Sequence, residues 1–179
     1  YETARAMAAE HNSIKVECRS FLELEAESVF DVITAINDPL AYLLDPGERI
    51  EALQRVYRAL RPGGMLILEI KNFLYKLLYH TECEEETLVI DGERIVHIMQ
   101  HDIDLHHGTW THRDEYLIEG KSTLLSKKHT VAIISPSELC YAIDQAGFVD
   151  LQTFNSYEAT RSERWNGRLL LLSTRKASI

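Results

Sequence analysis

Cysteine is scarce in this chain of 179 residues, and its few cysteines form no pattern. Cys18, Cys83 and Cys140 are odd in number and widely separated. A disulfide framework needs paired cysteines and a zinc site of the CxxC type needs closely spaced ones, so we expect neither a disulfide nor a metal site. Such cysteine usage is typical of a reducing compartment and predicts a cytoplasmic protein.

Long apolar runs and clusters of basic residues are also lacking. No apolar run approaches the roughly 18 residues that a membrane-spanning helix needs, and there is no signal-peptide pattern. The net charge is −9, and the 19 Lys and Arg residues are scattered. Because a nucleic-acid partner calls for a basic stripe, we expect neither a nucleic-acid nor a membrane partner. Nothing in the composition marks a boundary, so we predict one domain over residues 1–179.

The stretch from Phe30 to Ile70 predicts two parallel strands joined by a helix. Apolar runs at 32–36 and 65–70 do not alternate with polar residues, which is typical of parallel strands covered on both faces. Between them Asp45 is a good N-cap followed by proline, and apolar residues then recur at steps of three and four. In open α/β sheets ligands bind beyond the carboxyl ends of the strands, so the loop after the first strand is a candidate site.

The rest of the chain predicts a mixture of helices and antiparallel strands. Turn signals separate strand-like runs between 87 and 134, which indicates an inserted antiparallel meander of three or four strands. The segment 71–81 fits either a helix that faces the core or a flap over a ligand. The remaining expected elements are helices over Thr3–Glu10 and from Ser135, a short strand over Ile14–Cys18, and an antiparallel hairpin of 148–154 with 168–174.

Several motifs in this order resemble class I S-adenosylmethionine-dependent methyltransferases. They are FDVI at 30–33, ALRPGG at 59–64, SPSEL at 135–139 and AGF at 146–148. The resemblance implies an α/β fold: a Rossmann-like doubly wound sheet with an antiparallel C-terminal hairpin and an inserted antiparallel β meander. The core sheet and helices would take residues 1–86 and 135–179, and the meander of 87–134 would roof the acceptor site.

The resemblance also implies S-adenosylmethionine as cofactor and a small-molecule acceptor methylated at nitrogen or oxygen, and it leaves a homodimer open. The Gly-rich loop and the ribose-binding acid of such enzymes would precede Tyr1. Ser20 takes the place of an acidic residue that contacts the adenine amine in many relatives, and serine accepts a weaker hydrogen bond. The expected cofactor-binding residues are Ser20, Phe21, Ala35, Ile36 and Asn37.

Candidate catalytic and acceptor-binding residues come from the loop after the first strand and from the meander. Asn37 and Asp38 could orient an acceptor amine or hydroxyl, although the sequence NDP is also ordinary turn chemistry. Six of the eight histidines lie between 97 and 129, and one of them could take a proton from the acceptor. We expect His112 in that role, and Tyr42, His106 and Trp110 in acceptor binding.

Two other functions stay open beside the methyltransferase. A non-catalytic binding module with a methyltransferase-like fold would explain the same pattern, because fold does not fix function. A nicotinamide-dependent dehydrogenase shares the doubly wound sheet, but the antiparallel closing hairpin argues against it.

Overall fold

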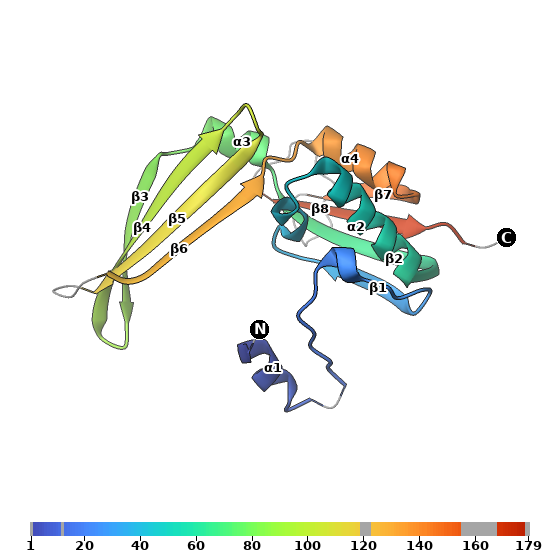
Figure 1. Ribbon diagram of the computed structural model, residues 1–179, viewed down its shortest axis with the longest axis horizontal. Helices are drawn as coiled ribbons and strands as arrows, with labels where there is room; N and C mark the ends of the chain where they lie inside the picture. Colours follow the sequence, from blue (N-terminus) through green and yellow to red (C-terminus); the bar gives the residue numbers. More distant parts are fainter. Residues whose placement is uncertain (1, 12, 119–122, 155–167, 178–179) are drawn as a thin grey trace.

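The computed structural model describes residues 2–11, 13–118, 123–154 and 168–177, which form two four-stranded sheets that lie beside each other (Figure 1). The elements are α1 (Glu2–Ala8), η1 (Phe21–Glu23), β1 (Phe30–Ala35), η2 (Pro39–Tyr42), α2 (Pro46–Ala59), β2 (Leu60–Lys71), α3 (Phe73–Leu78), β3 (Cys83–Ile90), β4 (Glu93–Asp104), β5 (Thr109–Ile118), β6 (Thr123–Ala132), α4 (Pro136–Gln145), β7 (Phe148–Phe154) and β8 (Arg168–Arg175).

The first sheet has the strand order β1-β2-β8-β7 and contains the predicted β-α-β unit. β1 pairs with β2 in parallel, and α2 connects them. Asp45 caps α2 as expected, because its carboxylate accepts the backbone N–H groups of Gly47 and Glu48 at 2.7 and 3.1 Å. The predicted parallel pair and the helix between its strands are confirmed.

The closing hairpin is also confirmed. β8 pairs antiparallel with both β2 and β7. Ser135 caps α4, which precedes β7, by accepting the N–H of Glu138 at 3.1 Å. The connection at 155–167 lies outside the described residues.

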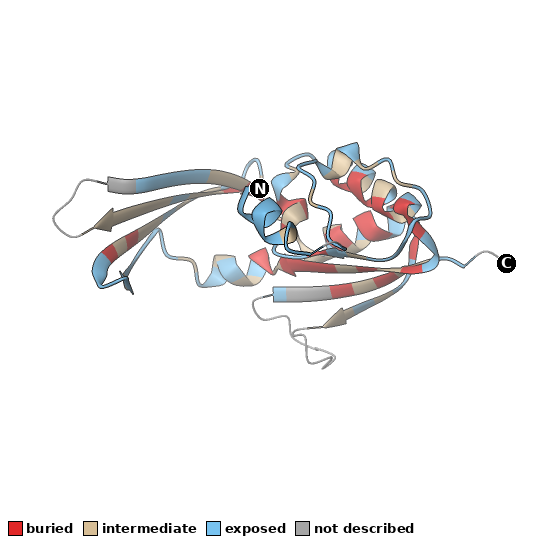
Figure 2. Ribbon diagram, turned by 90° about the horizontal axis from the view of Figure 1, so that it is seen from below, coloured by how far each residue is buried: buried red, intermediate tan, exposed pale blue. Residues whose placement is uncertain are grey.

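The main hydrophobic core lies between the first sheet and the helices α2 and α4. These helices contact each other and cover the same face of the sheet (Figure 2). Their buried residues, including Leu53, Val56 and Leu139, pack with Leu66 and Leu68 of β2 in one cluster. A doubly wound sheet, as expected from the sequence, has helices on both of its faces. Among the described residues, α2 and α4 both cover the same face, so this part of the prediction is not confirmed.

β1 is the edge strand of the first sheet, which corrects the prediction that both apolar strands are covered on two faces. Phe30 and Val32 are 43% and 52% exposed. Among the described residues β1 has a neighbouring strand on one side alone, so an apolar sequence did not guarantee burial.

The short strand expected at Ile14–Cys18 is wrong, since this segment has no strand structure. The physical reason is that no described strand lies beside it to pair with its backbone N–H and C=O groups. The helix expected over Thr3–Glu10 is present as α1, with slightly different ends.

The second sheet is the predicted meander, with four strands in the order β3-β4-β5-β6, all antiparallel. It begins at Cys83, a few residues earlier than expected. The segment before it forms α3, capped by Asn72, whose side chain accepts the N–H of Tyr75 at 3.2 Å. Within the described residues no helix is long and apolar enough to cross a membrane.

Candidate active site

The loop after β1 is fixed to β2 by the side chain of Asp38. Asn37 and Asp38 both adopt left-handed backbone conformations, with φ of 70° and 61°, which asparagine and aspartate tolerate better than most residues. The buried Asp38 carboxylate accepts the backbone N–H of Lys71, and the Asp38 N–H donates to the carbonyl of Glu69 at 3.3 Å. Asp38 therefore holds the loop against the end of β2.

Arg168, the first residue of β8, adds a second connection to the same loop. Its guanidinium forms an ion pair with the buried Glu69 and donates to Asn37 Oδ1 at 3.1 Å. Arg168 Nη1 and Lys71 Nζ each lie 3.8 Å from Asp38 Oδ2. Burial raises the pKa of Asp38, while the Lys71 N–H and the charges of Lys71 and Arg168 oppose that rise.

The residues expected to bind the cofactor lie on η1 and at the end of β1. Ser20 caps η1: its Oγ accepts the N–H of Leu22 at 3.2 Å, and its own N–H donates to Glu23 at 3.1 Å. Phe21 is half-buried against the main core. At the end of β1, Ala35 is buried, whereas Ile36 is 44% exposed and Asn37 is exposed.

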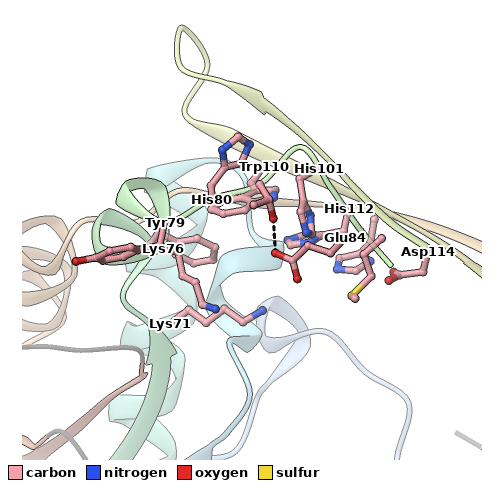
Figure 3. Close-up of a pocket in the computed structure, with 13 residues that line it drawn as sticks. Lys71, Lys76, Tyr79, His80, Glu84, His101, Trp110, His112 and Asp114 are labelled. Carbon is pink, nitrogen blue, oxygen red and sulfur yellow. Dashed lines mark hydrogen bonds between the residues drawn. The ribbon is translucent and has the colours of Figure 1, made fainter. Parts of the chain in front are cut away.

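A cavity of about 330 Å³ lies between α3 and the second sheet (Figure 3). Lys71 extends below Glu84, and Lys76 of α3 points toward Lys71 in this view. Thr81 closes one side by donating a hydrogen bond of 2.5 Å to Glu84. The lining residues are Lys71, Phe73, Lys76, Tyr79, His80, Thr81, Glu84, Met99, His101, Trp110, His112, Asp114 and His129.

A row of rings crosses the sheet side of this cavity. His112 stacks between Trp110 and His129, with ring centroids 5.4 and 4.8 Å away. His101 meets His112 edge-on at 4.9 Å. Tyr42 of η2 packs on His129 at 5.9 Å, so the row reaches from the second sheet to the loop after β1.

Two imidazoles of this row, His112 and His101, are poor bases and so present lone pairs at neutral pH. Burial lowers the pKa of His112 to about 4, helped by the nearby charges of His129, His101 and Lys71. Burial also lowers the pKa of His101. Two buried polar atoms have no hydrogen-bond partner among the described residues, His101 Nδ1 and Trp110 Nε1. Since unpaired buried polar groups are costly, these atoms are suited to a polar ligand.

The structure brings some of the expected acceptor residues together and separates others. Trp110 and His112 line the cavity, and Tyr42 lies behind it against His129. Asn37 and Asp38 do not line the cavity. Asp38 is nevertheless connected to it, because it binds the backbone N–H of Lys71, and Lys71 does line the cavity. His106 is exposed in the turn after β4, where its N–H donates to Asp104 at 2.9 Å, and it does not line the cavity.

Several cavity residues were not singled out from the sequence, among them Lys71, Glu84 and Asp114. Alternation along a strand could have placed Asp114 on the same face as Trp110 and His112. Alternation alone could not predict which strands pair with β5. Within the described part of the chain, no group of three or more His, Cys, Asp or Glu side chains could hold a metal ion.

No family model and no curated protein sequence matches this chain. Solved structures do match. An S-adenosylmethionine-dependent methyltransferase from Clostridium acetobutylicum is 16% identical, with a TM-score of 0.77, over 98% of this chain and 70% of its own. The CcbJ methyltransferase from Streptomyces caelestis is 21% identical, with a TM-score of 0.79, over 99% of this chain and 75% of its own.

A third match is CalS10, an amino pentose methyltransferase from Micromonospora echinaspora with S-adenosylmethionine bound. It is 14% identical, with a TM-score of 0.73, over 98% of this chain and 70% of its own. Likeness at this level of identity concerns the fold. The chain therefore has the fold of S-adenosylmethionine-dependent methyltransferases, as its motifs predicted.

Proposed function

We propose that this chain belongs to an S-adenosylmethionine-dependent methyltransferase that methylates a nitrogen or oxygen atom of a small molecule. The observation that carries the proposal is the double role of Lys71. Its backbone N–H is bound by Asp38 in the loop after β1, and its side chain lines the cavity under the second sheet. The loop where this fold binds its ligands and the cavity with neutral imidazoles are thus joined at one residue.

The end of β1 suits one wall of a cofactor site. Ile36 and Asn37 offer an apolar and a polar side chain at the carboxyl end of the strand, where both are exposed. Ser20 and Phe21 line a groove of about 240 Å³ with a hydroxyl and an aromatic ring, groups that suit an adenine. When bound, S-adenosylmethionine supplies a methyl group on a positively charged sulfur. We assign its contacts to Ser20, Phe21, Ala35, Ile36 and Asn37.

The protein's own task in methyl transfer is mainly to position the acceptor and exclude water. An acceptor nitrogen or oxygen that took up the methyl group would have to lose a proton, so the protein would need to orient that N–H or O–H and receive its proton. A neutral His112 can accept a hydrogen bond from the acceptor N–H or O–H, which directs the lone pair and gives the proton a path out.

The other candidate residues take supporting roles in this proposal. Asp38 positions the loop and Lys71, and Asn37 faces the methyl donor. Trp110 and Tyr42 shape the acceptor side, Trp110 through direct contact and Tyr42 through His129. The second sheet then serves as the roof of the acceptor site. The amino pentose methyltransferase among the structural matches supports a small-molecule acceptor.

Calorimetric titration of the full-length protein with S-adenosylmethionine tests the proposal. We expect saturable binding, competed by S-adenosylhomocysteine. A non-catalytic module with this fold predicts no binding, and that result would overturn the proposal.

A further inference from the structure

A chain of hydrogen bonds on the second sheet ends at the cavity. His97 of β4 is 8% exposed, and both of its ring nitrogens face carboxylates. Nδ1 lies 2.9 Å from Glu86 Oε1 of β3, and Nε2 lies 3.0 Å from Asp114 Oδ1 of β5. The ring also stacks on Tyr116 at 4.2 Å, nearly parallel. His97 is therefore held in one orientation by three side chains.

This geometry calls for a doubly protonated ring. A neutral imidazole has a single N–H and would leave one carboxylate facing a lone pair, whereas the imidazolium donates to both. Burial alone lowers the pKa of His97, but the hydrogen bonds that its ring donates to Glu86 and Asp114, together with their negative charges, outweigh that effect, and the pKa lies above its usual value.

Asp114 is the member of this chain that lines the cavity. Its side chain is 21% exposed, and the described residues supply hydrogen bonds to Oδ1 alone. A half-buried carboxylate is costly unless its oxygens accept hydrogen bonds. Trp110, 4% exposed and lining the same cavity, has an indole N–H that no described residue satisfies. Two polar groups of one cavity, on either side of His112 along β5 (Figure 3), are thus left for a ligand.

We propose that Asp114 binds an N–H or O–H donor of the acceptor molecule, and that His97 and Glu86 hold its carboxylate in place for that contact. The inference rests on the proposed function and adds a specificity-determining residue and two positioning residues to it. Lys71 and Lys76, on the α3 side, favour oxygen acceptors, while Asp114 on the sheet favours a donor. The cavity therefore has hydrogen-bond donors on one side and an acceptor on the other, and this difference orients the molecule that it binds.

The test uses full-length protein with isotope-labelled histidine, and two probes of one shape, cyclohexylamine and cyclohexanol. Binding is followed by the NMR signals of the His112 ring. We expect at least one probe to bind the wild type, and the stronger one identifies the donor as amine or hydroxyl. Asp114→Asn should weaken that probe by about tenfold, the scale of a lost charge-assisted hydrogen bond.

Glu115→Gln is the matched control, because it removes a carboxylate one residue along β5, on the opposite face. It should leave probe binding unchanged. Equal probe affinity in Asp114→Asn and Glu115→Gln, or no binding of either probe to the wild type, would overturn the proposal. S-adenosylmethionine affinity, measured alongside, should be the same in both variants. If the wild type does not bind S-adenosylmethionine at all, that result would instead refute the proposed function.

Glu86→Gln tests the positioning role without touching the cavity, since Glu86 is 51% exposed and does not line it. The NMR-measured pKa of His97 should fall, and probe affinity should fall about threefold, as expected for loss of one exposed charge partner. A lowered His97 pKa with unchanged probe affinity would show that the pair has a purely structural role and would overturn this part.

Discussion

The first sheet buries side chains of β2 and β8 under helices, whereas the second sheet leaves most of its side chains to solvent or to the cavity. Leu66, Leu68 and Leu171 of the first sheet are each 1% exposed beneath α2 and α4. In the second sheet β3 has no buried residue. Buried residues of β5 and β6 gather near the junction with the first sheet, as Trp110, Val131 and Ala132 do. The same backbone pairing thus serves stability in one sheet and, in our proposal, ligand binding in the other.

The sharpest way to break this comparison is one substitution made in both regions. Leu68→Ala should lower the free energy of unfolding by about 3 kcal/mol, because it removes buried methyl groups and leaves a cavity. Leu105→Ala, in the turn after β4 where the leucine is 75% exposed, should change it by less than about 0.5 kcal/mol. Urea unfolding measures both. Equal losses would show that the second sheet carries as much of the core as the first.

Arg49, which is 5% exposed, connects α2 to α4 and to the loop before α2. It donates to the carbonyls of Leu43 and Leu44 at 2.5 and 3.0 Å and forms an ion pair with Glu138 at 2.5 Å. Arg49→Met should cost about 2 kcal/mol of unfolding free energy, below the figure for a fully buried pair because Glu138 is partly exposed.

Arg113→Met, an exposed arginine of β5, is the control for Arg49→Met and should be close to neutral. A cost as large as that of Arg49→Met would place stabilising ion pairs on the second sheet as well.

The helix start at Asp45 allows a smaller test of the first region. Asp45→Ala removes the acceptor for two helix N–H groups and should cost about 1 kcal/mol. Asp45→Asn keeps an oxygen acceptor and should recover most of the loss in the same unfolding assay. If asparagine fails to rescue, the cap does not contribute through this hydrogen bond.

The two sheets also differ in how much of their structure could be predicted from the sequence. Local signals such as the Asp45 cap and the apolar runs act over a few residues, so the β-α-β unit of the first sheet followed from the sequence. The exposure of Phe30 in edge strand β1 depends on which strands lie beside it, and no local pattern reports that. Trp110 and His112, which line the cavity, could be nominated from the sequence because aromatic and imidazole groups stand out. Asp114 was not nominated, because the role we propose for it depends on His97, a partner on another strand.

The smallest expected effect concerns pH and the cavity side of the second sheet. His112 has a pKa of about 4 in the folded protein, against an ordinary value of 6.5. Between these values the unfolded chain binds a proton that the folded chain does not, so unfolding free energy falls as pH drops from 6.5 to 4.

His112→Asn should reduce this pH-dependent drop in unfolding free energy. The reduction should be below about 1 kcal/mol, because the side chain is half-buried and its charge is screened. Unfolding curves at several pH values, with an NMR titration of His112, check the sign. A His112 pKa near 6.5 would mean that the cavity does not keep the imidazole neutral.

Methyl transfer itself is the most direct test of the division between the two sheets. The full-length protein is incubated with S-adenosylmethionine carrying a deuterated methyl group and a small-molecule extract of its source, and products are separated by mass spectrometry. We predict a small molecule that gains one deuterated methyl group, with loss of this product in both Asn37→Ala and His112→Asn but not in Leu105→Ala. Label found only in protein or nucleic acid, or in no product at all, would contradict the account.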